Sequence, residues 1–149
     1  MSSPALLDVN VLVALFNPDH IHHDAAHDWF EENHTHGWAT CPITEQGVVR
    51  ILANPKYWPE FEPTASLVGR LGTFCSSPHH HFWADTLSFR DHTIFNLSHI
   101  SGHRQVTDVY LLGLARKMGG RLATFDQTIP LPAVIGAGRD TLAVIANAE

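Results

Sequence analysis

One stretch, TDVYLLGLARKMGGRLATFD at residues 107–126, constrains the fold more than any other part of the chain. Thr107 is predicted to cap a helix whose apolar residues recur at helical spacing, and a glycine pair ends that helix. Residues 122–124 then predict a short buried strand that stops at Asp126. A helix followed at once by a buried strand is typical of proteins built around a parallel β-sheet.

The rest of the chain continues this alternation of helices and short apolar strands. Strands are predicted at residues 5–8, 38–40, 122–124 and 142–145, with a further short strand and a brief helical segment within 79–89. Helices are predicted at residues 9–16, 22–33, 44–54, 64–74 and 107–118. The helix at 22–33 is predicted to lie on the surface, and the helix at 44–54 to have Thr44 as its N-cap. We therefore expect an α/β fold with a parallel β-sheet of about four to five strands and helices on both faces. A length of 149 residues, 44% of them hydrophobic, predicts one domain over 1–149.

Neither the hydropathy pattern nor the cysteines indicate an exported or membrane-bound protein. No apolar run approaches the roughly 20 residues of a membrane helix, and the first residues lack the layout of a signal peptide. We expect a cytoplasmic protein that does not enter a membrane. Cys41 and Cys75 lie in segments suited to packing, which favours small buried thiols over a disulfide or a metal site.

Charge is distributed unevenly along the chain. The net charge of −6 argues against a nucleic acid held by bulk electrostatics. Seven acidic residues and no Lys or Arg precede Arg50, whereas all the basic residues lie from Arg50 onward. A polyanion would therefore approach the later part of the sequence, where Arg50 and Arg104 are candidate phosphate contacts.

Four carboxylates occupy positions that packing alone does not explain. Asp8 and Asp126 each follow a buried strand, where open α/β sheets place their ligand sites. Glu45 and Asp108 each follow a threonine at the start of a predicted helix, where the helix dipole is expected to lower their pKa values. Alone, each helix-start acid would be a dipole partner and Asp126 would suit a turn. If all four converge, their repulsion requires a cation, and ligands that are all oxygens favour Mg²⁺ or Mn²⁺.

Three motifs give the chain a resemblance to a known family. They are LLDVNVLVAL near the start, TEQGVVRIL in the first third, and QVTDVYLLGLARKMGGRLATFD near the end. The chain resembles a PIN domain, and most closely the VapC-type ribonuclease toxins of toxin–antitoxin pairs, over nearly its whole length. Residues 55–100 match less closely than the rest.

The resemblance implies a site as well as a fold. Carried over by position, it implies that Asp8, Glu45, Asp108 and Asp126 are catalytic metal ligands for Mg²⁺ or Mn²⁺. It also places three smaller polar residues beside them as supporting groups: Asn10, Thr107 and Thr124.

The activity implied is that of an endoribonuclease toxin of a VapBC-type system. A metal-activated water would hydrolyse RNA phosphodiesters and leave 5′-phosphate and 3′-hydroxyl ends. The resemblance further implies a VapB-like antitoxin, whose segment packs on an apolar groove, and a homodimer.

Other functions stay open on the sequence alone. The first is a catalytically silent PIN-like module that binds RNA or a protein. The second is a phosphatase or receiver domain with Asp8 as phosphate acceptor, although Asn10 stands where such phosphatases need a second aspartate. The third is a metal buffer based on the 12 histidines, in which His23 and His27 lie four apart on a predicted helix without a third ligand at zinc-like spacing.

Overall fold

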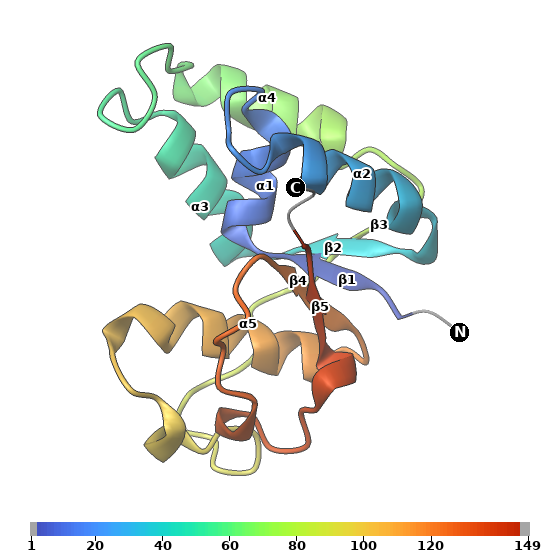
Figure 1. Ribbon diagram of the computed structural model, residues 1–149, viewed down its shortest axis with the longest axis vertical. Coiled ribbons are helices and arrows are strands. Elements are labelled where there is room, and N and C mark those ends of the chain that lie inside the picture. The colour runs from blue at the N-terminus through green and yellow to red at the C-terminus, as the bar shows by residue number, and fades with distance from the viewer. Residues whose placement is uncertain (1–2, 147–149) are drawn as a thin grey trace.

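The computed structural model describes residues 3–146, which form a parallel β-sheet between two layers of helix (Figure 1). The strands are β1 (Ala5–Leu7), β2 (Trp38–Thr40), β3 (His80–Phe82), β4 (Arg121–Thr124) and β5 (Leu142–Val144). The α-helices are α1 (Val9–Phe16), α2 (His23–Asn33), α3 (Pro42–Leu52), α4 (Thr64–Phe74) and α5 (Val106–Lys117). Short 3₁₀ turns complete the helical structure of the described part. No helix within it is long and apolar enough to span a bilayer.

The sheet has the strand order β3-β2-β1-β4-β5, and every pair of neighbours is parallel. From β1 the chain moves outward to β2 and β3, and then returns to the other side of β1 to form β4 and β5. The order of strands therefore reverses between β1 and β4, where Leu7 pairs with Ala123. In open α/β sheets the crevice beyond such a reversal is the usual place for a ligand site. The predicted α/β fold with a parallel sheet is confirmed.

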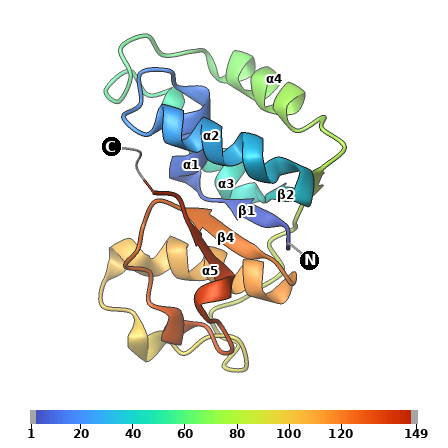
Figure 2. The same cartoon turned by 45° about the vertical axis from the view of Figure 1, so that its right-hand side comes forward.

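Helices cover both faces of the sheet, as predicted. Helices α1 to α4 lie over one face and α5 lies against the other (Figures 1 and 2). Successive residues of β1 point to opposite faces, so Ala5 and Leu7 join the core under α1 to α4, whereas Leu6 joins the core against α5. Since β1 is buried on both faces, its run of apolar residues is continuous rather than alternating.

Both threonine caps predicted from the sequence are wrong. Helix α3 begins at Pro42 with Cys41 as its N-cap, because the fixed φ angle of proline suits the first helical position. Thr44 lies one turn inside, where its hydroxyl accepts from the Cys41 amide at 3.0 Å and donates to the Cys41 carbonyl at 3.1 Å. Thr107 is the second residue of α5, because a 3₁₀ turn at His103–Gln105 runs directly into that helix.

The segment between β3 and α5 differs from the prediction in one element. The strand predicted within 79–89 forms as β3, but residues 83–89 contain no helix, and the next helical turn is Leu97–His99. The segment is instead fixed by side-chain packing, since a Cβ added at Gly113 of α5 would lie 2.5 Å from the Phe95 ring. Gly113 therefore allows Phe95, which is 1% exposed, to lie directly on α5.

Candidate functional site

Asp8 lies at the reversal of the sheet and is almost completely buried. It directly follows β1 and is the N-cap of α1, with 5% of its surface exposed. Its Oδ1 accepts from the Val9 amide at 2.7 Å, and its Oδ2 accepts from the Thr124 hydroxyl at 2.7 Å. Burial raises the pKa of Asp8, these two hydrogen bonds oppose the rise, and the charge of Asp126 adds to it. The carboxylate is thus held by two donors and by no cationic side chain.

Thr124 joins the two aspartates that follow β1 and β4. Its hydroxyl donates to Asp8 and accepts from the Asp126 amide at 3.1 Å. Asp126 in turn accepts from the Thr128 amide at 2.7 Å and from the Thr128 hydroxyl at 2.6 Å, both at Oδ1. The buried hydroxyl of Thr124 therefore sets the orientation of Asp8 and the backbone position of Asp126 together.

Asp108 approaches the same place from the first turn of α5. Its side chain is half-buried, and its pKa is raised to about 7, first by burial and then by the charges of Asp8 and Asp126. The prediction that the start of a helix would lower the pKa of Asp108 is wrong, because desolvation and repulsion outweigh the helix dipole. The three aspartates, which come from three different elements, are thus close enough to repel one another.

Glu45 lies in a different polar environment. It is in the first turn of α3, and its Oε2 accepts from the Thr40 hydroxyl at 2.6 Å. Neither Asp8 nor Asp108 has its pKa changed by Glu45. The start of α3 nevertheless lies beside α1, since a Cβ added at Gly47 would be 2.8 Å from a methyl carbon of Val9. The structure therefore brings Asp8, Asp108 and Asp126 together, with Glu45 on an adjacent helix.

The residues around Glu45 were missed by the sequence analysis. Cys75 and His80 lie there, and one ligand atom of each lies within 4.8 Å of the others and of a Glu45 oxygen. Thr40 is the last residue of β2, and a polar residue at the end of a buried strand was the one feature of the sequence that could have pointed to this place. The pairing of Cys75 with His80 had no signal, because the two residues follow α4 and begin β3 respectively.

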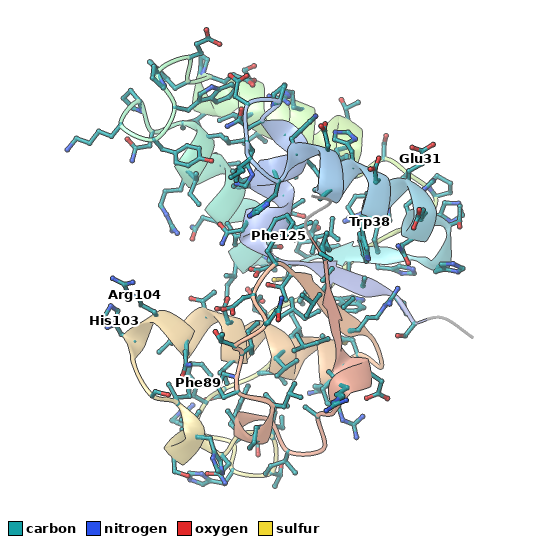
Figure 3. The ribbon with its side chains drawn as sticks, in the orientation of Figure 1. Glu31, Trp38, Phe89, His103, Arg104 and Phe125 are labelled. Atoms are coloured by element: carbon teal, nitrogen blue, oxygen red, sulfur yellow. The ribbon has the colours of Figure 1, made fainter. Side chains whose placement is uncertain are left out.

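The supporting residues and the two candidate arginines differ in exposure. Of the three supporting residues, Thr124 is buried in contact with Asp8, whereas Asn10 and Thr107 are exposed near the starts of α1 and α5. Arg50 is exposed on α3. Arg104 is exposed in the turn before α5 and extends outward from that end of the helix (Figure 3).

The two histidines that lie four apart in the sequence are close neighbours in α2. His23 and His27 are neighbours with ring centroids 4.4 Å apart, and a carbonyl oxygen of Ala14 lies 2.7 Å from Nδ1 of His23. No third ligand joins this pair in residues 3–146. Burial lowers the pKa of His20 and that of His80.

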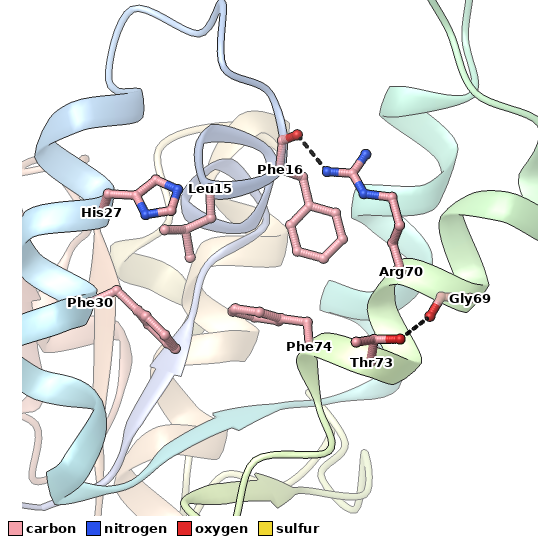
Figure 4. Close-up of a pocket in the computed structure, with 8 residues that line it drawn as sticks. All are labelled: Leu15, Phe16, His27, Phe30, Gly69, Arg70, Thr73 and Phe74. Carbon is pink, nitrogen blue, oxygen red and sulfur yellow. Dashed lines mark hydrogen bonds between the residues drawn. The ribbon is translucent and has the colours of Figure 1, made fainter.

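An apolar cavity of about 750 Å³ lies apart from the aspartates, between α1, α2 and α4 (Figure 4). The rings of Phe16, Phe30 and Phe74 line it, and the phenyl rings of Phe16 and Phe74 meet edge to face at 5.3 Å. Arg70 lies at its edge, donates to the carbonyl of Phe16 at 2.8 Å and forms an ion pair with Glu62. This cavity offers an apolar surface rather than catalytic groups.

Comparison with known proteins identifies relatives over most of the chain. The family model described as PIN domain matches residues 5–133. Three proteins of Mycobacterium tuberculosis are similar to the chain. Ribonuclease VapC44 is 42% identical over 141 residues, which are 95% of this chain and 99% of the relative. Ribonuclease VapC39 is 43% identical over 125 residues, covering 84% and 90%. Ribonuclease VapC38 is 48% identical over 122 residues, covering 82% and 84%.

Proposed function

Because this chain belongs to the PIN-domain family and has relatives named VapC ribonucleases, we propose that it is a metal-dependent endoribonuclease, the toxin of a VapBC-type system. Its substrate is RNA, and hydrolysis leaves 5′-phosphate and 3′-hydroxyl ends. The protein acts in the cytoplasm. The argument for catalysis starts from the charges at the reversal of the sheet.

The observation that carries this proposal is the mutual repulsion of Asp8, Asp108 and Asp126. The charge of Asp126 adds to the raised pKa of Asp8, and the charges of Asp8 and Asp126 both add to the raised pKa of Asp108. The one Lys or Arg ion pair within residues 3–146 is Arg70–Glu62, which involves none of the three aspartates. Carboxylates held together in this way favour binding of a cation. Oxygen ligands of this kind select Mg²⁺ or Mn²⁺ rather than a softer metal ion.

The residues that would hold the ion are the three aspartates, with Glu45 as the fourth acid. When bound, Mg²⁺ or Mn²⁺ supplies an activated water at neutral pH and offsets negative charge on the scissile phosphate. The chain itself supplies orientation. The Val9 amide and the Thr124 hydroxyl fix both oxygens of Asp8, and Thr128 fixes Asp126. Asn10 and Thr107 are polar neighbours for the substrate or for ordered water.

RNA approaches from the side that carries the exposed arginines. Arg104 lies just before α5, the helix that carries Asp108, and Arg50 lies on α3, the helix that carries Glu45. Each is placed to contact a phosphate group of a strand that reaches the acids. With a net charge of −6, the protein has little bulk attraction for RNA, so recognition depends on these local contacts and on shape.

A VapB-like antitoxin and a second copy of the chain complete the proposal. The apolar cavity between α1, α2 and α4 is the surface on which we place a segment of the antitoxin. Gly69 borders that cavity, and a Cβ there would meet nothing within 4 Å. Gly69→Glu should therefore weaken antitoxin binding without harming the fold. Gly72→Glu is the matched control on the same helix, since Gly72 has equally open surroundings and does not line the cavity. Equal binding by both variants would exclude the cavity.

A second candidate is a catalytically silent PIN-like module that binds RNA or a protein. The observation that favours it is the position of Glu45, which is hydrogen-bonded to Thr40 and not electrostatically coupled to the aspartates. The two candidates differ in one measurable property, which is cleavage.

The deciding experiment incubates total RNA with purified protein in EDTA, Mg²⁺ or Mn²⁺ and maps the ends of any products. Asp8→Asn and Asp108→Asn are the test variants, and Asp28→Asn, on the exposed surface of α2, is the control. Metal-dependent cuts that both test variants lose and the control keeps support the nuclease. RNA binding without cleavage by the folded protein in either metal supports the silent module.

A further inference from the structure

Three side chains of different chemistry meet beside the carboxyl end of β2. Glu45 comes from α3, Cys75 follows the last residue of α4, and His80 begins β3. One ligand atom from each lies within 4.8 Å of the other two, and all three side chains are half-buried. The cluster thus combines a carboxylate, a thiol and an imidazole with access to solvent.

The Thr40 hydroxyl and the Trp38 ring hold these groups in place. The Thr40 hydroxyl donates to Glu45 at 2.6 Å and lies 2.8 Å from Nε2 of His80. Because a hydroxyl has one hydrogen, the contact with His80 has Nε2–H as its donor. The His80 ring also lies against Trp38, with ring centroids 4.6 Å apart. Strand pairing and ring packing therefore orient the imidazole before any ligand arrives.

From this geometry we propose a zinc site formed by Glu45, Cys75 and His80, with water as the fourth ligand. Sulfur, nitrogen and oxygen ligands around one ion are typical of Zn²⁺, which binds four ligands at about 2.0 to 2.3 Å. The three side chains need to approach one another slightly for all of them to reach one ion at such distances. Binding through Nε2 of His80 releases the proton of that nitrogen to solvent while Nδ1 takes one up from solvent, so the ring stays neutral. The thiol proton of Cys75 also passes to solvent, so one proton is released in total for each zinc ion bound. Mg²⁺ does not replace zinc at the thiol and the imidazole, because it requires oxygen ligands.

Zinc at this site regulates the enzyme, a consequence that rests on the proposed function. Glu45 is the acid that the proposed catalytic site and the zinc site share. When Zn²⁺ takes the Glu45 carboxylate, the three aspartates lose their fourth acid, so zinc inhibits cleavage without displacing RNA. The thiol and imidazole make this inhibition specific for soft divalent ions.

Cobalt provides a test of the site that does not depend on nuclease activity. Co²⁺ bound to a thiolate gives a near-ultraviolet charge-transfer band, so the full-length protein is titrated with Co²⁺ and the band is then displaced by Zn²⁺. We expect the band in the wild type and in His81→Gln, whose altered side chain is exposed and outside the cluster. Cys75→Ser should lose the band, and His80→Gln should bind zinc at least about tenfold more weakly in competition with a chromophoric indicator.

The result that overturns the site is a missing band in the wild type, or a band that persists in Cys75→Ser and so arises from Cys41. Inhibition is measured separately, as the cleavage rate in Mg²⁺ with increasing Zn²⁺. Cys75→Ser should retain the basal rate and need at least about tenfold more zinc for half inhibition. Equal inhibition of the wild type and Cys75→Ser would contradict the regulatory role, even where the cobalt band establishes the site.

Discussion

The acids at the reversal of the sheet and the acid on α3 differ in what surrounds them. Asp8, Asp108 and Asp126 lie close enough for their charges to interact, and hydroxyl and amide groups donate hydrogen bonds to Asp8 and Asp126. Glu45 faces a thiol, an imidazole and the hydroxyl of Thr40. The first group is unfavourable without a hard cation, whereas the second is satisfied without one. The difference teaches that four acids at equivalent strand and helix ends need not be equivalent in energy.

The largest effect is expected for Asp8→Asn. Removing this proposed metal ligand should lower the cleavage rate by about a hundred- to a thousandfold, which is the usual effect of removing one group that stabilises charge in an active site. In EDTA the variant should be as stable as the wild type or more stable, because a buried charge next to Asp126 is gone. Cleavage assays and thermal unfolding measure the two effects. A variant that loses both activity and stability would make Asp8 a structural residue.

Thr124→Val should produce the next largest effect. Valine has a similar shape but removes the donor to Asp8 and the acceptor for the Asp126 amide. We expect a loss of activity of about 10- to 100-fold, as for residues that orient metal ligands. The free energy of unfolding should fall by about 1 to 3 kcal/mol, because a buried carboxylate and a partly buried amide lose their hydrogen-bond partner.

Thr124→Ser is the matched control, since it keeps the hydroxyl and should restore most of the activity lost in Thr124→Val. If serine and valine reduce the cleavage rate equally, the methyl packing of Thr124 matters rather than its hydrogen bonds. In that case the link between Asp8 and Asp126 through Thr124 would not contribute to catalysis.

The stability of the metal-free protein should depend on pH through Asp108. Its pKa rises from 3.8 to about 7 in the folded protein, so the folded state binds this proton more tightly than the unfolded state. Stability should therefore be present at low pH and be lost as the pH rises from about 4 through about 7. Denaturant unfolding in EDTA across this range measures it.

Asp108→Asn should remove this part of the pH dependence, whereas Glu45→Gln should leave it unchanged. The difference between each variant and the wild type isolates the effect of Asp108 from that of the histidines, because all three proteins contain the same histidines. The same pH profile for the wild type and Asp108→Asn would show that neither burial nor the neighbouring aspartates raise the pKa of Asp108 in the folded protein.

The smallest effect is expected at the arginines. Arg104→Ala should weaken RNA binding a few-fold and lower the slope of log affinity against log salt by about 0.7, the value for one phosphate contact with a single strand. The rate at saturating RNA should not change. Binding measured at several salt concentrations tests this. An unchanged slope would place Arg104 outside the RNA interface.

The order of the elements and the positions of the aspartates were predictable from the sequence, because both follow from patterns of neighbouring residues. A continuous apolar strand before Asp8, and a helix and glycine pair before the strand ending near Asp126, specify a parallel sheet from neighbouring residues alone. The helix starts were less predictable. Helix α3 begins at Pro42, before the predicted cap Thr44, and α5 begins at Val106, before the predicted cap Thr107, because a 3₁₀ turn leads into it.

The environment of each acid could not be predicted, because it depends on contacts between distant residues. The raised pKa of Asp108 comes from burial and from the charges of Asp8 and Asp126, which are distant from Asp108 in the sequence. The neighbours of Glu45 are Cys75, which follows α4, and His80 of β3, and both lie in the part of the sequence with the weakest family resemblance.

The central claim is that the three coupled aspartates bind a hard divalent cation. Calorimetric titration of Mg²⁺ into the metal-free protein tests it directly, because histidine and cysteine side chains do not compete for this ion. The account predicts saturable binding to the wild type and to Asp28→Asn, and at least about tenfold weaker binding to Asp8→Asn and Asp108→Asn. The same Mg²⁺ affinity in all four proteins, or no binding to the folded wild type, would contradict it.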